Sequence, residues 1–373
     1  MNLHADFTTH AGERIRQAAA AGRALRIRGG GSKDFYGQAL VGDILDTTPL
    51  NGVVSYEPSE LVVTALAGTP LADVEALLLA QGQCLPFEPP HFNSDAAFSA
   101  TVGGMVAAGL SGPARASVGA VRDYVLGVKL INGKGEALTF GGQVMKNVAG
   151  YDVSRLMVGA MGTLGLLTEI SIKVLPIAPL EATLKFEMTQ GQALTQLNTW
   201  GGQPLPLNAS CWLEEGGVGT LYLRLRGAVA AIQSACVKLG GERLTQGQAV
   251  ADWQLCRNQQ LPWFKTRTES QDLWRLSVPQ TAPVLDLPDA PLIEWHGGQR
   301  WVRASPDDGQ RIRELALSAG GNATLFIAAS AHKTTARDTF DTLKPPLDRI
   351  QRDLKREFDP AGVFNPHRMH ADW

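Results

Sequence analysis

The chain has 373 residues, 44% of them apolar and 19% charged, and a formal net charge of −2 at pH 7. A near-neutral chain has no overall positive field to attract nucleic acid, which disfavours a basic nucleic-acid binder. The length favours two domains. No run approaches the ~18 consecutive apolar residues of a membrane-spanning helix, and the first residues lack a signal-peptide pattern, so we expect an intracellular protein.

The four cysteines are widely spaced. Cys84, Cys211, Cys236 and Cys256 include no Cys-x-x-Cys pair. This spacing disfavours a zinc site or an iron–sulfur cluster held by this chain, and it predicts buried free thiols in a reducing compartment.

A short strand leads into a glycine-rich loop near the N-terminus. Helical composition from about 11 to 21 ends at Gly22, and strand-like residues 24–27 run into Arg28-Gly29-Gly30-Gly31-Ser32-Lys33. Successive glycines let the backbone turn several N–H groups toward one point, where a phosphate can bind. No helical pattern follows and no Gly-Lys-Ser/Thr closes the loop, which disfavours the Rossmann and Walker folds. Taken alone, such a run is more often an ordinary loop.

The next segment predicts two strands and a helix. Residues 53–56 and 61–65 are strand-like, and turn residues separate them. Thr69 is the expected N-cap with Pro70 at the first helical position, and Gly82 ends the helix. We interpret the segment as an α+β unit whose helix covers a sheet.

Two further glycine clusters complete the first half of the chain. The segment from Ala100 to Gly112 contains mostly small residues, which favour either a flat ligand lying against the backbone or tight helix–sheet packing. Residues 124–140 then predict a β-hairpin around Asn132-Gly133-Lys134-Gly135. In the third cluster, Lys146 to Asp152 precedes a short helix to Ala160 and the loop Gly162 to Gly165, which leads into a strand over 166–175. Asp152 is either an N-cap or a ligand contact.

The composition changes after Pro176 and Pro179. Strands at 182–187, 209–213 and 219–226 alternate with helices at 192–200 and 228–239, an order typical of a ferredoxin-like split βαβ domain. A hairpin around His296, a helix over 307–318 and a strand over 324–328 complete this domain. A helix over 344–358 and a stiff tail to Pro366 end the pattern. We therefore expect domains at 1–176 and 177–343, and a tail, 344–373, that returns to the first domain.

Several weak motifs occur here in one order, namely Arg28 to Ser32, Ala100 to Gly104, Gly150 to Asp152, Gly159 to Glu169 and Phe358 to Pro366. This order resembles the vanillyl-alcohol oxidase and p-cresol methylhydroxylase (PCMH-type) flavoproteins. Within that family the resemblance is nearest to the FAD-binding subunits of glycolate oxidases, on Gly112 to Arg115 and Gly119 to Asp123. It implies an α+β fold, in which a PCMH-type two-subdomain FAD-binding domain precedes a ferredoxin-like cap.

The resemblance also implies FAD and its contacts. The diphosphate would lie on the first glycine loop and on the turn from Thr101 to Gly104, the adenine near Gly162 to Gly165, and the isoalloxazine ring toward the cleft under the cap. The implied FAD-binding residues are Arg28, Gly29, Gly30, Gly31, Ser32, Lys33, Thr101, Val102, Gly103, Gly104, Met105, Gly112, Arg115, Gly119, Gly162, Thr163, Leu164, Gly165 and Ile170.

Two departures from the family pattern bear on the chemistry. Many relatives bind the flavin covalently through a histidine near the first loop; Gly29 to Lys33 contains none, so we expect non-covalent FAD, with His91 an ordinary hydrogen-bonded residue. The metal-binding run His-x-Gly-Asp-Gly-Asn-x-His of relatives that oxidise D-2-hydroxy acids is also missing, so no metal site is expected and the catalytic residues stay unassigned. His296 and His332 are expected to be structural. Four cap cations are expected to be solvated, namely Arg224, Arg226, Arg303 and Lys333.

The implied function is the FAD-binding subunit of a complex that oxidises glycolate to glyoxylate. Its expected partners are a second FAD-binding oxidase subunit and an iron–sulfur subunit, with a cytoplasmic location and peripheral attachment to the inner face of the cell membrane through those partners. Two alternatives stay open: an autonomous FAD-dependent oxidoreductase of another 2-hydroxy acid or an alcohol, and a scaffold whose FAD is structural while the partner does the chemistry.

Overall fold

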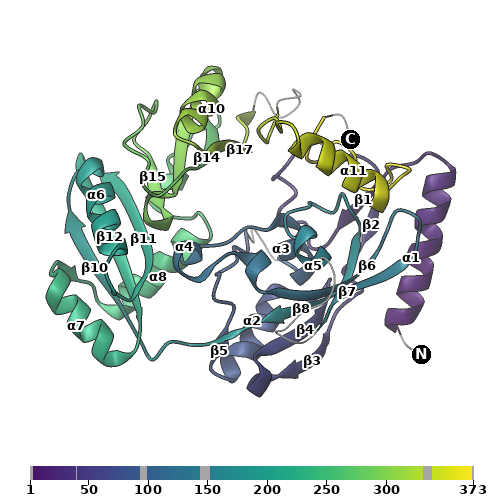
Figure 1. Ribbon diagram of the computed structural model, residues 1–373, viewed down its shortest axis with the longest axis horizontal. Helices are drawn as coiled ribbons and strands as arrows, with labels where there is room; N and C mark the ends of the chain where they lie inside the picture. The colour runs from purple at the N-terminus through teal and green to yellow at the C-terminus, as the bar shows by residue number, and fades with distance from the viewer. Residues whose placement is uncertain (1–2, 39, 93–98, 143–151, 331–337, 372–373) are drawn as a thin grey trace.

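The computed structural model describes residues 3–38, 40–92, 99–142, 152–330 and 338–371. Its main elements are two sheets, one of five strands and one of eight, which Figure 1 shows as separate parts of the molecule. Both ends of the chain lie on the side of the five-stranded sheet, and helix α11 (Leu347–Phe358) lies close to strand β1 (Leu25–Arg28) (Figure 1).

The five-stranded sheet is antiparallel and has the order β3-β4-β8-β6-β7. Its strands are β3 (Val53–Glu57), β4 (Val62–Leu66), β6 (Val125–Ile131), β7 (Ala137–Gly141) and β8 (Leu166–Lys173), close to the predicted ranges. Strand β8 is central and buried along almost its whole length, including its polar residues Thr168, Glu169 and Ser171.

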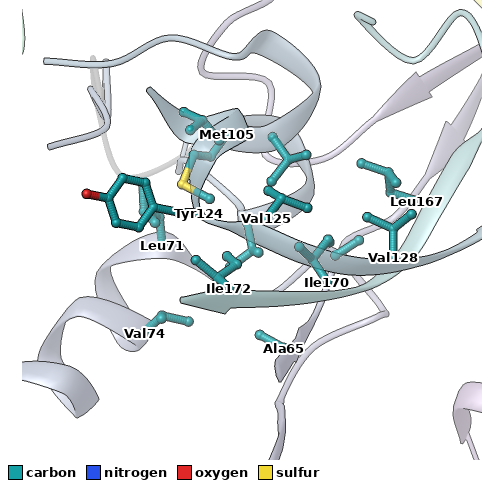
Figure 2. Packing of buried hydrophobic residues seen from close by; sticks show 14 of the residues in the cluster. Ala65, Leu71, Val74, Met105, Tyr124, Val125, Val128, Leu167, Ile170 and Ile172 are labelled. Carbon is teal, nitrogen blue, oxygen red and sulfur yellow. The ribbon is translucent and has the colours of Figure 1, made fainter. Parts of the chain in front are cut away.

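Helices α2 (Leu71–Ala80) and α3 (Val102–Ala108) contribute side chains to the core against this sheet. Figure 2 shows Leu71 and Val74 on one side and Met105 on another, packed around Val128 and Ile170. Each fully buried aliphatic side chain stabilises the fold by about 1.5–3 kcal/mol, so this core fixes the position of α3.

A second, smaller layer holds the N-terminal segment. Helix α1 (Leu3–Ala20) extends further toward the N-terminus than the sequence predicts and packs through Ile15 on strand β1. Strand β1 pairs in parallel with β2 (Asp43–Asp46) and with Phe364 of the C-terminal tail. The tail therefore returns to the first strand of the chain.

The eight-stranded sheet contains two ferredoxin-like halves, where the sequence predicts one. The first half has the strand order β13-β10-β12-β11. Its elements are β10 (Leu180–Glu187), α6 (Gln190–Gly201), β11 (Leu207–Glu215), β12 (Val218–Gly227), α7 (Val229–Leu239) and β13 (Glu242–Arg243). The second half repeats this order as β17-β14-β16-β15, with the connection 278–291 in place of the first helix. Its elements are β14 (Asp272–Ser277), β15 (Leu292–Glu294), β16 (Gln299–Ala304), α10 (Gly309–Ser318) and β17 (Asn322–Ile327).

Strands β11 and β15 pair and join the two halves into one sheet. The prediction contained the hairpin around His296, the helix and the last strand of the second half, but it did not identify β14 and therefore did not recognise a second ferredoxin-like unit. Polar residues at 268–272 and the long connection after β14 make this six-residue strand hard to identify from the sequence. Helices α8 (Gln246–Arg257) and α9 (Pro262–Lys265), which connect the halves, were also not predicted.

Local details differ from prediction in two places. The N-cap of α2 is Pro70, not Thr69, because the Thr69 hydroxyl is bonded to both the N–H (2.9 Å) and the carbonyl (3.0 Å) of Gly52. Helix α11 begins at Leu347, after two prolines, rather than at Lys344. Asp152 is an N-cap, as one of its two interpretations required, because its Oδ1 accepts from the N–H of Arg155.

The chain crosses from one sheet to the other after β9 (Leu175–Pro176), which pairs with β5 (Gln83–Cys84). We propose a domain boundary at residue 176 and a second at 343 on this basis. No helix among the described residues is both long and apolar enough to span a bilayer.

Candidate functional site

Two adjoining cavities lie where the three glycine clusters meet. They share Ile27, Gly29, Gly104, Met161 and Asn365 in their walls. The residues implied by the sequence that line one cavity or both are Arg28, Gly29, Gly30, Gly31, Ser32, Lys33, Thr101, Gly103, Gly104, Gly162, Leu164 and Gly165. The structure thus brings together segments that are more than 130 positions apart in the chain.

The first glycine loop, Gly29 to Lys33, packs directly against the segment before α3. A Cβ on Gly30 would lie 1.8 Å from the carbonyl oxygen of Ser99, and one on Gly29 would lie 2.5 Å from Oγ1 of Thr101. Glycine is required here because the two backbones approach too closely for any side chain. The same loop leaves polar groups available, since the N–H groups of Gly30, Gly31 and Ser32 donate to no acceptor within the described part of the chain.

Charged side chains surround this loop. Lys33 lies in the cavity wall, and burial together with the nearby Arg257 lowers the pKa of its ammonium group to about 8. Arg26 and Arg28 both donate to Oδ2 of Asp34, at 3.2 and 2.8 Å. A half-buried ammonium next to a second cation is stabilised when an anion binds, so the loop has the donors and the charge to hold a phosphate.

The C-terminal tail builds the opposite wall of the site. Asn365 accepts from the N–H of Ile27 at 2.8 Å and donates to the carbonyl of Met161 at 2.6 Å, which links the first loop to the third. Arg368 donates to the carbonyls of Lys33 (3.3 Å) and Asp34 (3.1 Å). Sequence reasoning identified the tail but assigned no site role to these two residues.

A buried ion pair holds the tail in place. Lys355 Nζ donates to Oδ2 of Asp359 (2.6 Å) and to the carbonyls of Thr163 (2.8 Å) and Phe364 (3.0 Å). The Asp359 carboxylate also accepts from the N–H groups of Val363 and Phe364. These bonds connect α11, the tail and the third glycine loop.

The remaining implied residues lie away from the two cavities. Val102, Met105 and Ile170 are buried in the core of the five-stranded sheet (Figure 2 shows the latter two), and the hydroxyl of Thr163 donates to the carbonyl of Ala160. Gly112 packs against the carbonyl of Glu88, 2.3 Å from where its Cβ would lie. Arg115 and Gly119 line a separate cavity. Of the third cluster, Lys146 to Tyr151 lies outside the described residues.

Aromatic side chains from loops of the first half of the chain and from the eight-stranded sheet meet beside the first glycine loop. Tyr36 lies 5.1 Å from Phe326 of β17, and Phe326 lies 4.9 Å from Trp301 of β16, measured between ring centroids. Phe35 lies between Phe92 and Phe326, at 5.3 and 5.5 Å. These contacts form an apolar wall between the loop and the eight-stranded sheet. Its residues come from separate segments of the chain, so no single segment of the sequence predicts it.

Two histidines singled out in the sequence, His91 and His296, each make a side-chain hydrogen bond. His91 Nε2 lies 2.9 Å from a carboxylate oxygen of Glu75, as expected for a hydrogen-bonded loop residue. His296 Nε2 lies 3.0 Å from the hydroxyl of Ser117, and burial lowers the pKa of its imidazole to about 4, so the ring is neutral at pH 7. His332 lies outside the described residues.

The expectation that the cap arginines are solvated is wrong for three of them. Arg224 is 2% exposed and bonds to both carboxylate oxygens of Glu88 at 2.7 Å, so it connects the eight-stranded sheet to the segment after β5. Arg226 pairs with Glu88 and Glu181, and Arg303 pairs with Asp289. Lys333 lies outside the described residues.

The cysteines are free, as predicted. Cys211 and Cys256 are buried, whereas Cys84 and Cys236 are only partly so. No group of three or more metal-ligating side chains occurs in the part of the chain that the structure describes.

Comparisons with known proteins agree with this geometry. A family model described as an FAD binding domain matches residues 8–141. Glycolate oxidase subunit GlcE of Escherichia coli (strain K12) is 44% identical over 367 residues, which is 98% of this chain and 98% of that protein. Glycolate oxidase subunit GlcD of Bacillus subtilis (strain 168) is 30% identical over 135 residues, which is 36% of this chain and 28% of that protein.

Among solved structures, an alkyldihydroxyacetonephosphate synthase superposes with a TM-score of 0.65 over 96% of this chain and 75% of that chain. The sequence identity is 16%, so this likeness concerns the fold alone.

Proposed function

The chain belongs to the family of the glycolate oxidase subunit GlcE, and from this membership we propose that it is the FAD-binding subunit of a complex that oxidises glycolate to glyoxylate. Its predicted fold class, a PCMH-type FAD-binding domain followed by a ferredoxin-like cap, is confirmed, and so is its cofactor, FAD. It is an FAD-dependent oxidoreductase. The observation that carries the proposal is the 44% identity to GlcE over 98% of both chains, and the glycine-lined cavities are in agreement with it.

We propose that the first glycine loop and the turn from Thr101 to Gly104 hold the FAD diphosphate. The N–H groups of Gly30, Gly31 and Ser32, which have no acceptor among the described residues, and the ammonium of Lys33 support this assignment, because a diphosphate needs several donors and positive charge. The small residues around Gly162 to Gly165 leave room for a flat ring, which supports the adenine position. The first loop has no histidine, so the binding is non-covalent.

The chemistry divides between the cofactor and the chain. Bound FAD would supply the acceptor for a hydride from the carbon that bears the hydroxyl group of the substrate. The chain must bind the substrate carboxylate, exclude water and orient that carbon. The apolar wall of Tyr36, Trp301 and Phe326 is suited to excluding water from the cleft.

We further propose that electrons leave through partner subunits, one a second FAD-binding oxidase subunit and one an iron–sulfur subunit. The four cysteines are free and widely spaced, which is consistent with a cluster carried by a partner. A cytoplasmic location, with attachment to the inner face of the cell membrane through those partners, is part of the same proposal.

An anaerobic bleaching experiment tests the function. The FAD-loaded chain is mixed with glycolate, alone and after reconstitution with the two partners, and flavin absorbance and reduction of an artificial acceptor are followed. We expect glycolate-dependent turnover only in the complex. Robust turnover by the isolated chain would favour the autonomous oxidoreductase, and a flavin of this chain that stays oxidised even in the complex would favour the scaffold.

A further inference from the structure

Two arginines, one from each half of the chain, have no carboxylate partner among the described residues. Arg115 begins helix α4 (Arg115–Val118), which packs against β11 of the eight-stranded sheet, and Arg275 lies in strand β14 of the same sheet. The Arg115 guanidinium stacks on Trp295, 4.4 Å from the ring centroid. Arg275 donates to the Tyr36 hydroxyl at 3.3 Å and lies 5.8 Å from the rings of Tyr36 and Phe326. Within the described part of the chain, neither forms an ion pair.

Other arginines near the boundary between the sheets are neutralised. Arg224 pairs with Glu88, Arg257 with Glu75, and Arg303 with Asp289. Sheltered charges in proteins are normally paired, because desolvating a charge without a partner is costly. Arg300 and Arg368 also lack a carboxylate partner among the described residues, but both donate to backbone carbonyls instead. No such carbonyl bond is seen for Arg115 or Arg275 in the described part of the chain, so these two are available to pair with an anion.

A cavity lies beside Arg115 and includes Ser277, two positions along strand β14 from Arg275. Arg115, Trp295 and Ser277 line it together with Gln280, so its walls come from both parts of the molecule. Ser277 follows Arg275 by two positions in β14 and therefore lies on the same face of the sheet, because side chains alternate along a strand. That face is the one that contacts Tyr36. The cavity thus lies next to Arg275 along the sheet surface.

Arg115 and Asp123 line the cavity with opposite charges, and Arg275 adds a positive charge nearby. Burial lowers the pKa of Arg115, and repulsion by Arg122 and Arg275 lowers it further, so the two guanidinium groups lie close enough to repel each other. Asp123 also lines the cavity and opposes this shift, but its Oδ2 accepts from the N–H of Ala120 at 2.8 Å and is not ion-paired with Arg115.

We propose that Arg115 and Arg275 together bind the carboxylate group of a small organic acid between the two sheets. This proposal rests on the proposed function, in which that acid is the 2-hydroxy acid substrate. Arg275 is held by the Tyr36 hydroxyl and Arg115 by the face of Trp295, so both donors are oriented before the ligand arrives. A planar carboxylate accepts two hydrogen bonds from a guanidinium, which suits this site better than a spherical anion.

Calorimetric titration of the FAD-loaded chain with oxalate tests the site. Oxalate has a carboxylate but no hydrogen to transfer, so binding is measured apart from oxidation. Losing a charge-assisted hydrogen bond should weaken oxalate binding about 10- to 100-fold in Arg275→Met and in Arg115→Met. Arg122→Met removes an exposed positive charge near Arg115 and serves as the control, with an expected change below about threefold.

Further measurements separate the possible outcomes. Flavin content and melting temperature establish that each variant is folded. If Arg275→Met loses FAD, Arg275→Lys is used instead. This variant keeps the positive charge, so it should weaken oxalate binding by less than the roughly 10- to 100-fold expected for loss of the guanidinium. Unchanged oxalate affinity in the Arg275 and Arg115 variants would overturn the proposal, as would sulfate binding as tightly as oxalate. Failure of glycolate to bleach the wild-type complex while oxalate binding still depends on these arginines would overturn the proposed function and leave this site standing.

Discussion

Replacing Lys355 with methionine tests whether the C-terminal tail holds the FAD site together. The side chain is 7% exposed, and its ammonium makes three hydrogen bonds, to Asp359 and to the carbonyls of Thr163 and Phe364. Lys355→Met keeps most of the apolar stem but leaves the fully buried Asp359 carboxylate without its counter-charge. Breaking a buried pair from one side costs about 3–5 kcal/mol, a large fraction of the ~5–15 kcal/mol that stabilises a typical domain.

Urea unfolding of the chain without FAD measures this loss of stability. The adjacent Arg356→Met is the matched control, because Arg356 is 73% exposed and pairs only with the exposed Asp353, so its loss should change stability by less than about 0.5 kcal/mol. Adding Asp359→Asn to Lys355→Met removes the buried charge and should recover part of the loss. A destabilisation below about 1 kcal/mol in Lys355→Met would refute the reasoning, because it would mean that the buried carboxylate is not dependent on its partner.

Three further outcomes follow from the site and the sheet boundary. Gly30→Ala should abolish FAD retention, because the new Cβ would lie 1.8 Å from the carbonyl oxygen of Ser99. Gly201→Ala is the control and should retain FAD, because the space around Gly201 is open. The absorbance of the flavin band measures the FAD content of the two purified variants. FAD affinity should fall up to tenfold per pH unit above pH ~8, where Lys33 loses its proton in the FAD-free chain, and fluorescence titrations of Lys33→Met should lack that dependence. Glu88→Gln should lower the melting temperature at pH 7. Burial raises the pKa of the Glu88 carboxyl, but the attraction of Arg224 and Arg226 outweighs burial, so the pKa is lower in the folded chain than in the unfolded chain. The contribution of Glu88 to stability is therefore complete above about pH 4.5 and is lost as the pH falls through the lowered pKa.

Most elements of the first half could be predicted because their signals are local. The hairpin at Asn132 to Gly135 and the strand after Gly165 depend on turn residues and apolar runs that a short window contains. Thr69 shows the limit of such signals, since its hydroxyl bonds to Gly52, 17 positions away, instead of capping the adjacent helix. A capping preference of about 1 kcal/mol is easily outweighed by two tertiary hydrogen bonds.

The charged residues of the second half could not be predicted in the same way. Arg224 looks like a surface residue in the sequence, yet its carboxylate partner, Glu88, lies 136 positions earlier. Arg275 was not singled out at all, because strand β14 was not identified and nothing in its neighbours marks the face on which it lies. Whether an arginine is solvated, paired or available for a ligand depends on which parts of the fold meet, and a single sequence does not show that.

The roles of Asn365 and Lys355 connect FAD binding to the fold as a whole. The N–H of Ile27 and the side chain of Asn365 are 338 positions apart, and their hydrogen bond places the tail against the first glycine loop. The same amide donates to Met161, next to Gly162, so the tail connects two walls of the cavities. A ligand that contacts both walls binds more tightly when the tail is docked than when it is undocked. By thermodynamic linkage, the bound ligand stabilises the docked tail by that same difference in binding free energy. FAD should therefore protect the amides of α11 and the tail from hydrogen exchange more than those of the distant helix α7, and equal protection of the two would argue against coupling between tail and cofactor.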